Sequence, residues 1–172
     1  MKTLFLAAAL LAASAASAQT ASSDAALTKR LNQLMRDPAA PETEVQALLD
    51  NCHFTQIIRK YRTAGKQNES AVFQVSHQKN GADWAVKSDD KVEFELKLGV
   101  EWSQVTSLTY APALDEKTNR RYFEVKIKRE RAAPNGSGTS STTLELPLYT
   151  SNEAVARDIL RQLEQVRRRC GE

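Results

Sequence analysis

The stretch that decides the fold is residues 91–99, with the sequence KVEFELKLG. Apolar and charged residues alternate along it without interruption. Neighbouring side chains of a strand point to opposite faces of a sheet, so this alternation predicts a strand with one buried face and one wet face. The predicted buried face takes Val92, Phe94, Leu96 and Leu98, and the wet face takes Lys91, Glu93, Glu95 and Lys97. Glutamates interleaved with lysines are typical of a solvated, charge-balanced surface and not of a catalytic pair of carboxylates.

Shorter strand patterns lie on both sides of this stretch. Asn80-Gly81 stands between two of them and is a strong signal for a tight β-hairpin. The predicted strands are residues 54–62, 71–78, 82–88, 91–99, 101–110, 121–131 and 142–149. About seven short strands in succession favour mostly antiparallel pairing.

Two short helices are predicted before these strands. The first covers residues 24–36, where leucines recur at helical spacing. The second covers residues 41–50, because Pro41 is well placed as a first helical residue. The residues predicted to face inward are Leu27, Leu31 and Leu34 in the first helix and Val45, Leu48 and Leu49 in the second.

A third helix is predicted from Glu153 to about Arg169. The preceding residues form the pattern of a capping box, in which Thr150 accepts a backbone N–H and Glu153 reaches back. The apolar stripe of this helix consists of Ala156, Ile159, Leu160, Leu163, Val166 and Cys170. A helix with one such stripe covers an open end or a face of a sheet.

The order of these elements resembles that of a pleckstrin-homology-like (PH-like) domain. The resemblance rests on the strand-rich meander, the motif Leu144-x-Leu146-x-Leu148 and the capped helix, and it covers residues 54–170. It implies an α+β fold with a PH-like barrel or an orthogonal sandwich and a C-terminal capping helix, and it implies a role as a binding scaffold. An α+β fold of another kind, with a helix on a sheet, is the alternative.

The first residues of the chain have the features of a signal peptide for export. Residues 1–18 contain a positive start at Lys2, an apolar run and the small-x-small pattern that ends at Ala18. We expect cleavage before Gln19, although an uncleaved anchor or a buried helix fits the apolar run as well. The prediction is a soluble periplasmic or secreted protein of a bacterial envelope, with a leader and helices over residues 19–53 and a β-rich domain over residues 54–172.

Cys52 and Cys170 are the two cysteines of the chain. An even count in an oxidising compartment favours one intramolecular disulfide. Closing a loop of this length stabilises a fold by on the order of 4–5 kcal/mol in the chain-entropy model. The alternatives are an intermolecular disulfide, free thiols, or a catalytic Cys52 beside His53, although residues adjacent in sequence rarely reach nucleophile–base geometry.

Signals for other chemistry are weak. The two histidines, His53 and His77, stand in no metal-binding spacing, and Asp89-Asp90 lacks the pattern of a calcium loop. The chain has neither a nucleophile elbow nor a phosphate-binding glycine loop before a helix. We therefore predict no catalytic residues, no metal and no cofactor.

Basic residues form clusters that fit an anionic partner. The predicted patch consists of Arg59, Lys60, Arg62, Lys66, Lys126 and Lys128. A formal net charge of +3 over 172 residues gives no general attraction to nucleic acid. The alternative is that these charges keep the strands soluble and protect sheet edges.

The function that these features favour is a non-catalytic interaction or structural module, monomeric or weakly dimeric, with an envelope or secreted protein as its partner. An open sheet edge, or a groove beside the last helix, is a suitable binding surface. A carrier of a small apolar ligand within the β core is the second hypothesis, with Phe73, Phe94 and Phe123 as lining residues. A hydrolase with a dispersed site is the third.

Overall fold

The computed structural model describes residues 23–62, 73–79, 82–88, 91–132 and 138–171, with the side chains of residues 73–79, 82–88 and 132 left aside. The predicted signal peptide lies outside these ranges. Within them, no helix combines the length and the apolar character that a membrane span needs.

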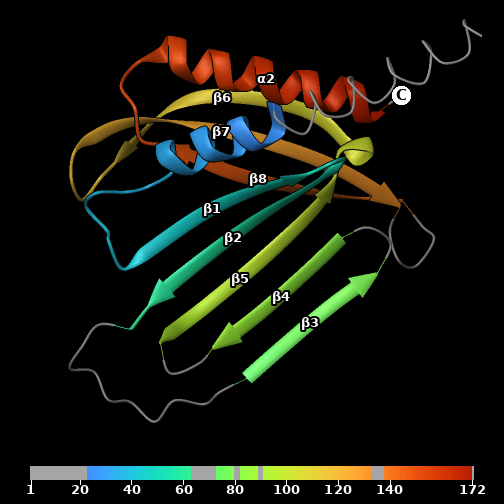
Figure 1. Cartoon of the computed structure of the whole chain (residues 1–172), viewed down its shortest axis with the longest axis horizontal. Coiled ribbons are helices and arrows are strands. Elements are labelled where there is room, and N and C mark those ends of the chain that lie inside the picture. The colour runs from blue at the N-terminus through green and yellow to red at the C-terminus, as the bar shows by residue number, and fades with distance from the viewer. Residues whose placement is uncertain (1–22, 63–72, 80–81, 89–90, 133–137, 172) are drawn as a thin grey trace, which may run out of the picture.

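The largest element is a five-stranded antiparallel sheet, which we call the first sheet (Figure 1). Its strand order is β1-β2-β5-β4-β3. β3, β4 and β5 follow one another as a meander, and β2 lies beside β5, which is a Greek-key arrangement. The strands are β1 (Thr43–Asp50), β2 (His53–Tyr61), β3 (Phe73–Lys79), β4 (Ala82–Ser88) and β5 (Val92–Glu101). The pairing of Lys79 with Ala82 confirms the predicted hairpin between β3 and β4.

A second, three-stranded antiparallel sheet has the order β6-β7-β8. The 3₁₀-helix η1 (Trp102–Gln104) leads the chain from β5 into this sheet. Its strands are β6 (Val105–Asp115), β7 (Arg120–Ala132) and β8 (Thr139–Leu148). Each of the seven predicted strands thus overlaps one of the strands from β2 to β8, with the largest difference at β6, which begins four residues later and ends five residues later than predicted.

Residues 43–50 are a strand, so the predicted second helix is wrong. Val45, Leu48 and Leu49 fit a helical stripe, but Val45, Ala47 and Leu49 fit the inner face of a strand equally well. Residues 43–50 form a strand and not a helix because they pair with β2 along the whole length of β1. The described chain therefore has eight strands, not about seven, and the β-rich domain begins before residue 54.

The two sheets do not close into a barrel. In the described part of the chain, no strand of one sheet pairs with a strand of the other. The sheets pack on one another near η1, where the Gln56 Nε2 donates to the Glu145 carbonyl oxygen at 2.8 Å. Trp102, which is 1% exposed, contacts Phe54 edge-on in the shared core. The PH-like resemblance stays a prediction, without the closed barrel that it implied.

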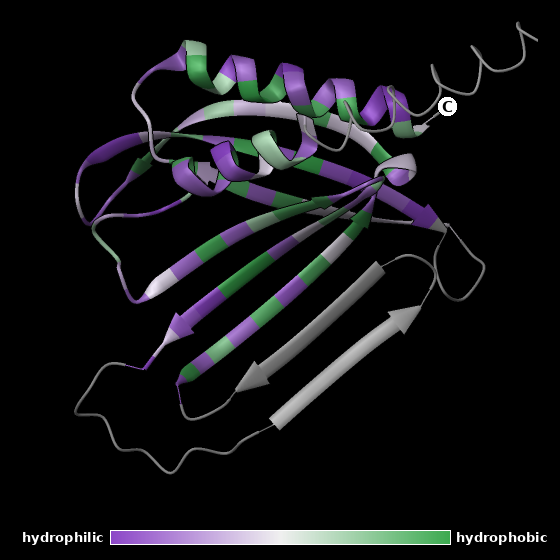
Figure 2. Cartoon of the chain, viewed as in Figure 1, coloured by the Kyte–Doolittle hydropathy of each residue, from purple (hydrophilic) through white to green (hydrophobic). Residues whose placement is uncertain are grey.

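The last helix, α2 (Glu153–Gly171), lies over β6 and η1 (Figure 1). Ala156, Ile159, Leu163 and Val166 are its buried residues, and Figure 2 shows apolar and polar residues alternating along it. The predicted capping box is confirmed in part. Thr150 Oγ1 accepts the Asn152 N–H at 3.2 Å, as predicted, and Asn152 Oδ1 accepts the Ala154 N–H at 3.0 Å. Glu153 does not reach back but accepts the Tyr110 hydroxyl.

The N-terminal helix (residues 23–34) lies between α2 and β1 (Figure 1). Leu27 and Leu31 are buried as predicted, while Met35, just after the helix, is buried more fully than Leu34. Arg30 pairs with Asp158 of α2, and the Tyr149 N–H donates to the Leu34 carbonyl oxygen at 2.8 Å. The helix and the two sheets therefore share one core.

Apolar and charged residues of β5 lie on opposite faces, as predicted. Two of these residues, however, differ from the prediction in how much of their surface is exposed. Phe94 on the apolar face is 37% exposed, and Glu95 on the polar face is 8% exposed. Glu95 lies between Arg59 and Lys97, whose side chains cover it. Phe94 lies at the end of the strand farthest from η1, beyond the region where the second sheet packs. Alternation with a period of two thus predicts on which face of the sheet each side chain lies. The elements and side chains that pack on that face decide how deeply the side chain is buried.

Candidate functional site

A groove of about 880 Å³ runs between the N-terminal helix and the edge strand β1. The helix supplies one wall, the turn with Pro38 and Pro41 closes one end, and the first half of β1 forms the other wall. Its lining residues are Lys29, Asn32, Gln33, Arg36, Asp37, Pro38, Pro41, Thr43, Glu44, Val45, Gln46 and Tyr61. The groove thus exposes one edge of a sheet beside a helix.

Asn32 covers the centre of this edge. Its Oδ1 accepts the Ala47 N–H at 2.6 Å, and its Nδ2 donates to the Ala47 carbonyl oxygen at 3.0 Å. Both backbone groups of Ala47 therefore point away from β2 and toward the helix. An edge strand offers such groups to any passing strand, and a side-chain amide that occupies them blocks pairing at that point.

Val45 carries the next pair of backbone groups on the same edge. In an antiparallel ladder, the residues whose N–H and C=O point outward alternate along the strand. Since Ala47 points outward, Val45 does too. Among the described residues, nothing bonds to its N–H or C=O, and Val45 lines the groove. The N–H and the C=O of Val45 can therefore form hydrogen bonds with the backbone of an extended peptide.

The charges that line the groove are unbalanced. Lys29 and Arg36 are exposed and form no ion pair with any described residue. The Tyr61 hydroxyl donates to Glu44 at 2.6 Å, and that bond raises the pKa of Tyr61. Asp37 pairs with Arg120. The acids are thus partnered and the two cations are not, so the groove favours a negatively charged occupant.

Asp37 also anchors the turn at the closed end of the groove. Burial raises its pKa, but the Ala39 N–H and Arg120 outweigh that effect and hold the pKa below the ordinary value. Arg120 lies over the ring of Tyr149 at 4.6 Å. Burial, together with Asp37, raises the pKa of Tyr149 to about 12. This cluster fixes the turn, and the Asp37 carboxylate in it is ionised at neutral pH.

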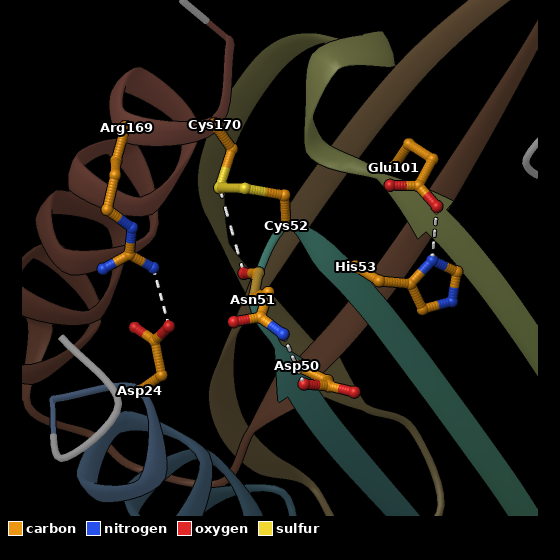
Figure 3. The surroundings of a disulfide bond; sticks show 8 residues. All are labelled: Asp24, Asp50, Asn51, Cys52, His53, Glu101, Arg169 and Cys170. Carbon is orange, nitrogen blue, oxygen red and sulfur yellow. Dashed lines mark hydrogen bonds and ion pairs between the residues drawn. A yellow bond between two sulfur atoms is a disulfide. The ribbon is translucent and has the colours of Figure 1, made fainter. Parts of the chain in front are cut away.

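A second groove of about 620 Å³ lies at the other end of the N-terminal helix, beside the disulfide. Cys52 and Cys170 are bonded, with their Cα atoms 5.4 Å apart, which confirms the predicted pairing. Cys52 lies in the β1–β2 turn and not in a helix, so the bridge ties that turn to the end of α2. Figure 3 shows the buried Asp24 pairing with Arg169 next to it, at 2.6 Å. The two contacts hold both helices against β1.

His53 lies beside a carboxylate, an arrangement that a hydrolase could use. Its Nδ1 lies 2.8 Å from Glu101 Oε1, across the β2–β5 ladder (Figure 3). The two side chains are 32% and 37% exposed, and neither lines either of the two grooves. The neighbouring Cys52 sulfur is held in the disulfide, so it offers no thiolate. The side chain of His77 lies outside the described residues.

The predicted basic patch is divided between the two sheets. Arg59 pairs with Glu95, and Lys60 with Glu93, on β2 and β5. On β7, Lys126 pairs with Glu124 and Glu145, and Lys128 pairs with Glu130. Arg62 lies just after β2 and has partners of its own, and Lys66 lies outside the described residues. Cross-strand and neighbouring carboxylates therefore balance Arg59, Lys60, Lys126 and Lys128.

Of the lining residues named for an apolar carrier, Phe94 and Phe123 line neither groove. Phe94 is on the first sheet, and Phe123 packs against Tyr110 on the second, with ring centroids 6.1 Å apart. The side chain of Phe73 lies outside the described residues. In the ranges that the structure describes, no group of three or more His, Cys, Asp or Glu side chains is placed to hold a metal ion.

The sequence did not predict the groove. Its key residues, Asn32 and Val45, carry no motif, and residues 41–50 resembled a helix, which has no edge. No protein-family model matches this chain, and no curated protein or solved structure shows significant similarity to it. Its function is therefore inferred from its own geometry.

Proposed function

We propose that this protein is an exported, non-catalytic interaction domain that binds an extended, acidic segment of a partner protein along the edge of β1. The observation that carries the proposal is the unpartnered backbone of Val45 in the 880 Å³ groove. An extended peptide adds to a sheet edge through main-chain hydrogen bonds, and the walls of the groove select its side chains. Lys29 and Arg36 supply the selection for acidic residues.

The disulfide supports this proposal. It joins the β1–β2 turn to α2, and Asp24 and Arg169 add a contact between the two helices. The groove is thereby built on elements that are tied together at one end. A rigid groove loses less conformational entropy on binding than a mobile one.

A library of random short peptides displayed on phage tests the proposal against the immobilised protein. We expect enriched peptides to carry Asp or Glu and to bind more weakly as salt rises, because exposed charge pairs are screened. The substitution V45P removes the outward N–H and should weaken binding roughly 3–10-fold. V45A is the matched control, because it retains the N–H and shortens the side chain.

The charge reversals K29E and R36E should each reduce affinity for the selected peptides, whereas K128E on β7 should not. Equal binding by V45P and V45A would contradict pairing at this edge. Enrichment of peptides without acidic residues would contradict the assigned role of Lys29 and Arg36. The carrier and hydrolase alternatives stay predictions, without a described site that favours either of them.

A further inference from the structure

A second charged feature lies on the inner face of β7, away from the groove. Side chains two residues apart on a strand share a face, so Arg129 and Arg131 lie on the same side as Val125 and Ile127. Val125 and Ile127 are fully buried, and Arg129 is only 9% exposed. The apolar inner face of β7 therefore ends in two arginines.

These arginines have no acidic partner among the described residues. The Arg129 Nη1 donates to the Gly99 carbonyl oxygen at 3.0 Å. The Nε atoms of both Arg129 and Arg131 are buried and make no hydrogen bond. Lys128 and Glu130, between and beside them, lie on the opposite face and pair with each other at 2.9 Å. Burying a guanidinium without a counter-charge is costly, and two of them repel each other.

The paired strand adds two hydroxyl groups. In the β7–β8 register, Arg129 lies opposite Thr142 and Arg131 lies opposite Ser140. Directly opposed side chains have Cβ atoms about 4.5–5.5 Å apart. Both hydroxyl-bearing residues are half-buried. Two guanidinium groups and two hydroxyl groups thus form a two-by-two array on one face.

We infer that Arg129, Arg131, Ser140 and Thr142 form a binding site for the oxyanion group of a small ligand, a carboxylate or a phosphate. Guanidinium groups hold such oxyanions through paired N–H donors, and hydroxyls donate as well. The bound anion neutralises the repulsion between the arginines. Burial, with the charge of Arg131, lowers the pKa of Arg129, which agrees with a cation that lacks a counter-charge. This inference is independent of the peptide groove.

The test is a titration of the ¹⁵N-labelled protein with inorganic phosphate and, in a separate arm, with succinate, at constant ionic strength. We expect amide shifts concentrated at residues 129–131 and 140–142, and the arm with tighter binding identifies the class of oxyanion. At ten times the dissociation constant, the midpoint of thermal unfolding should rise by roughly 3–5 °C.

Arg131→Gln is the main variant, because Arg131 is only half-buried and its loss should spare the fold. It should abolish the saturable shifts and the thermal response. Lys128→Met is the matched control, since it removes one positive charge from the same strand but on the other face. Arg129→Met should melt at or above the wild-type temperature without phosphate and show no response to it.

Two outcomes would overturn the inference. One is the absence of saturable shifts at these residues with either anion. The other is a response that Lys128→Met loses as fully as Arg131→Gln, which would mean a general effect of charge. If Arg129→Met does not fold, the Arg131→Gln and Lys128→Met pair still decides the question.

Discussion

The side chain of Asn32 bonds both backbone groups of Ala47, at 2.6 and 3.0 Å, where a neighbouring strand would otherwise pair. The contact spans the 15 residues between the N-terminal helix and β1. It fixes the distance between the two walls of the groove, and it divides the free edge of β1 into separate parts.

Replacing Asn32 by alanine should therefore destabilise the fold and uncover the edge. Two half-buried hydrogen bonds are lost, which corresponds to about 1–3 kcal/mol and a fall in the midpoint of roughly 2–4 °C per kcal/mol. Hydrogen exchange at the Ala47 amide should accelerate. Gln33→Ala, on the exposed side of the same helix, is the control and should leave both readouts unchanged.

Breaking the disulfide should lower stability more than any single hydrogen bond. Cys52 and Cys170 are 118 residues apart, and the chain-entropy model gives on the order of 4–5 kcal/mol for such a loop. Cys52→Ser, Cys170→Ser and the double variant should melt at one common temperature, well below that of the oxidised protein. Reductive alkylation followed by intact-mass analysis reports the bond. A reduced protein with unchanged melting would show that the bridge contributes nothing.

Glu95 should make stability fall in acid. Burial raises its pKa, but Arg59 and Lys97 outweigh burial, so the folded pKa lies below the ordinary value of 4.5. A lowered pKa contributes stability that is present above 4.5 and is lost as the pH falls through the folded value. Urea unfolding between pH 7 and pH 3 measures this loss.

The substitution E95Q should reduce that acid dependence. At neutral pH it should cost about 1–3 kcal/mol, because Arg59 loses a charged partner. E116Q, in the exposed turn between β6 and β7, is the control and should have the free energy of unfolding of the wild type at every pH. If the free energy of unfolding of E95Q falls with pH as steeply as that of the wild type, Glu95 is not the cause of the acid dependence.

Tyr149 should ionise later than an ordinary tyrosine. Burial and Asp37 raise its pKa from 10.0 to about 12. A raised pKa contributes stability that is complete below pH 10 and is lost as the pH rises through about 12. The ultraviolet absorbance of tyrosinate measures the titration. Y149F keeps the ring under Arg120 and should remove the part of the absorbance change that occurs at the highest pH. If Y149F instead removes absorbance change near pH 10, the raised pKa does not belong to Tyr149.

Local periodicity predicted most of the fold. The sequences of β5, β7 and β8 alternate clearly between apolar and polar residues, so these strands are visible without knowledge of their partners. Residues 43–50 satisfy both a helical and a strand pattern, and only pairing with β2 selects the strand. The disulfide was predictable because the chain has two cysteines and one possible intramolecular pairing.

The candidate sites were harder to predict, because they depend on contacts between distant residues. The sequence shows Lys126 as a member of a basic cluster, but not that Glu124 and Glu145 neutralise it. Conversely, Arg129 and Arg131 stand beside Lys128 in the sequence, and only their place on the inner face separates them from it. Neither charge balance nor burial is a local property.

The spacing of the two cysteines also sets an order of events during folding. A chain is made and delivered from its N-terminus, so Cys52 emerges 118 residues before Cys170. Strands β2 to β8 emerge in that interval, and the helix that carries Cys170 packs on η1 and β6. The sheets can therefore form before the second sulfur has been made, and Cys52 is without its disulfide partner until the residues of the last helix follow.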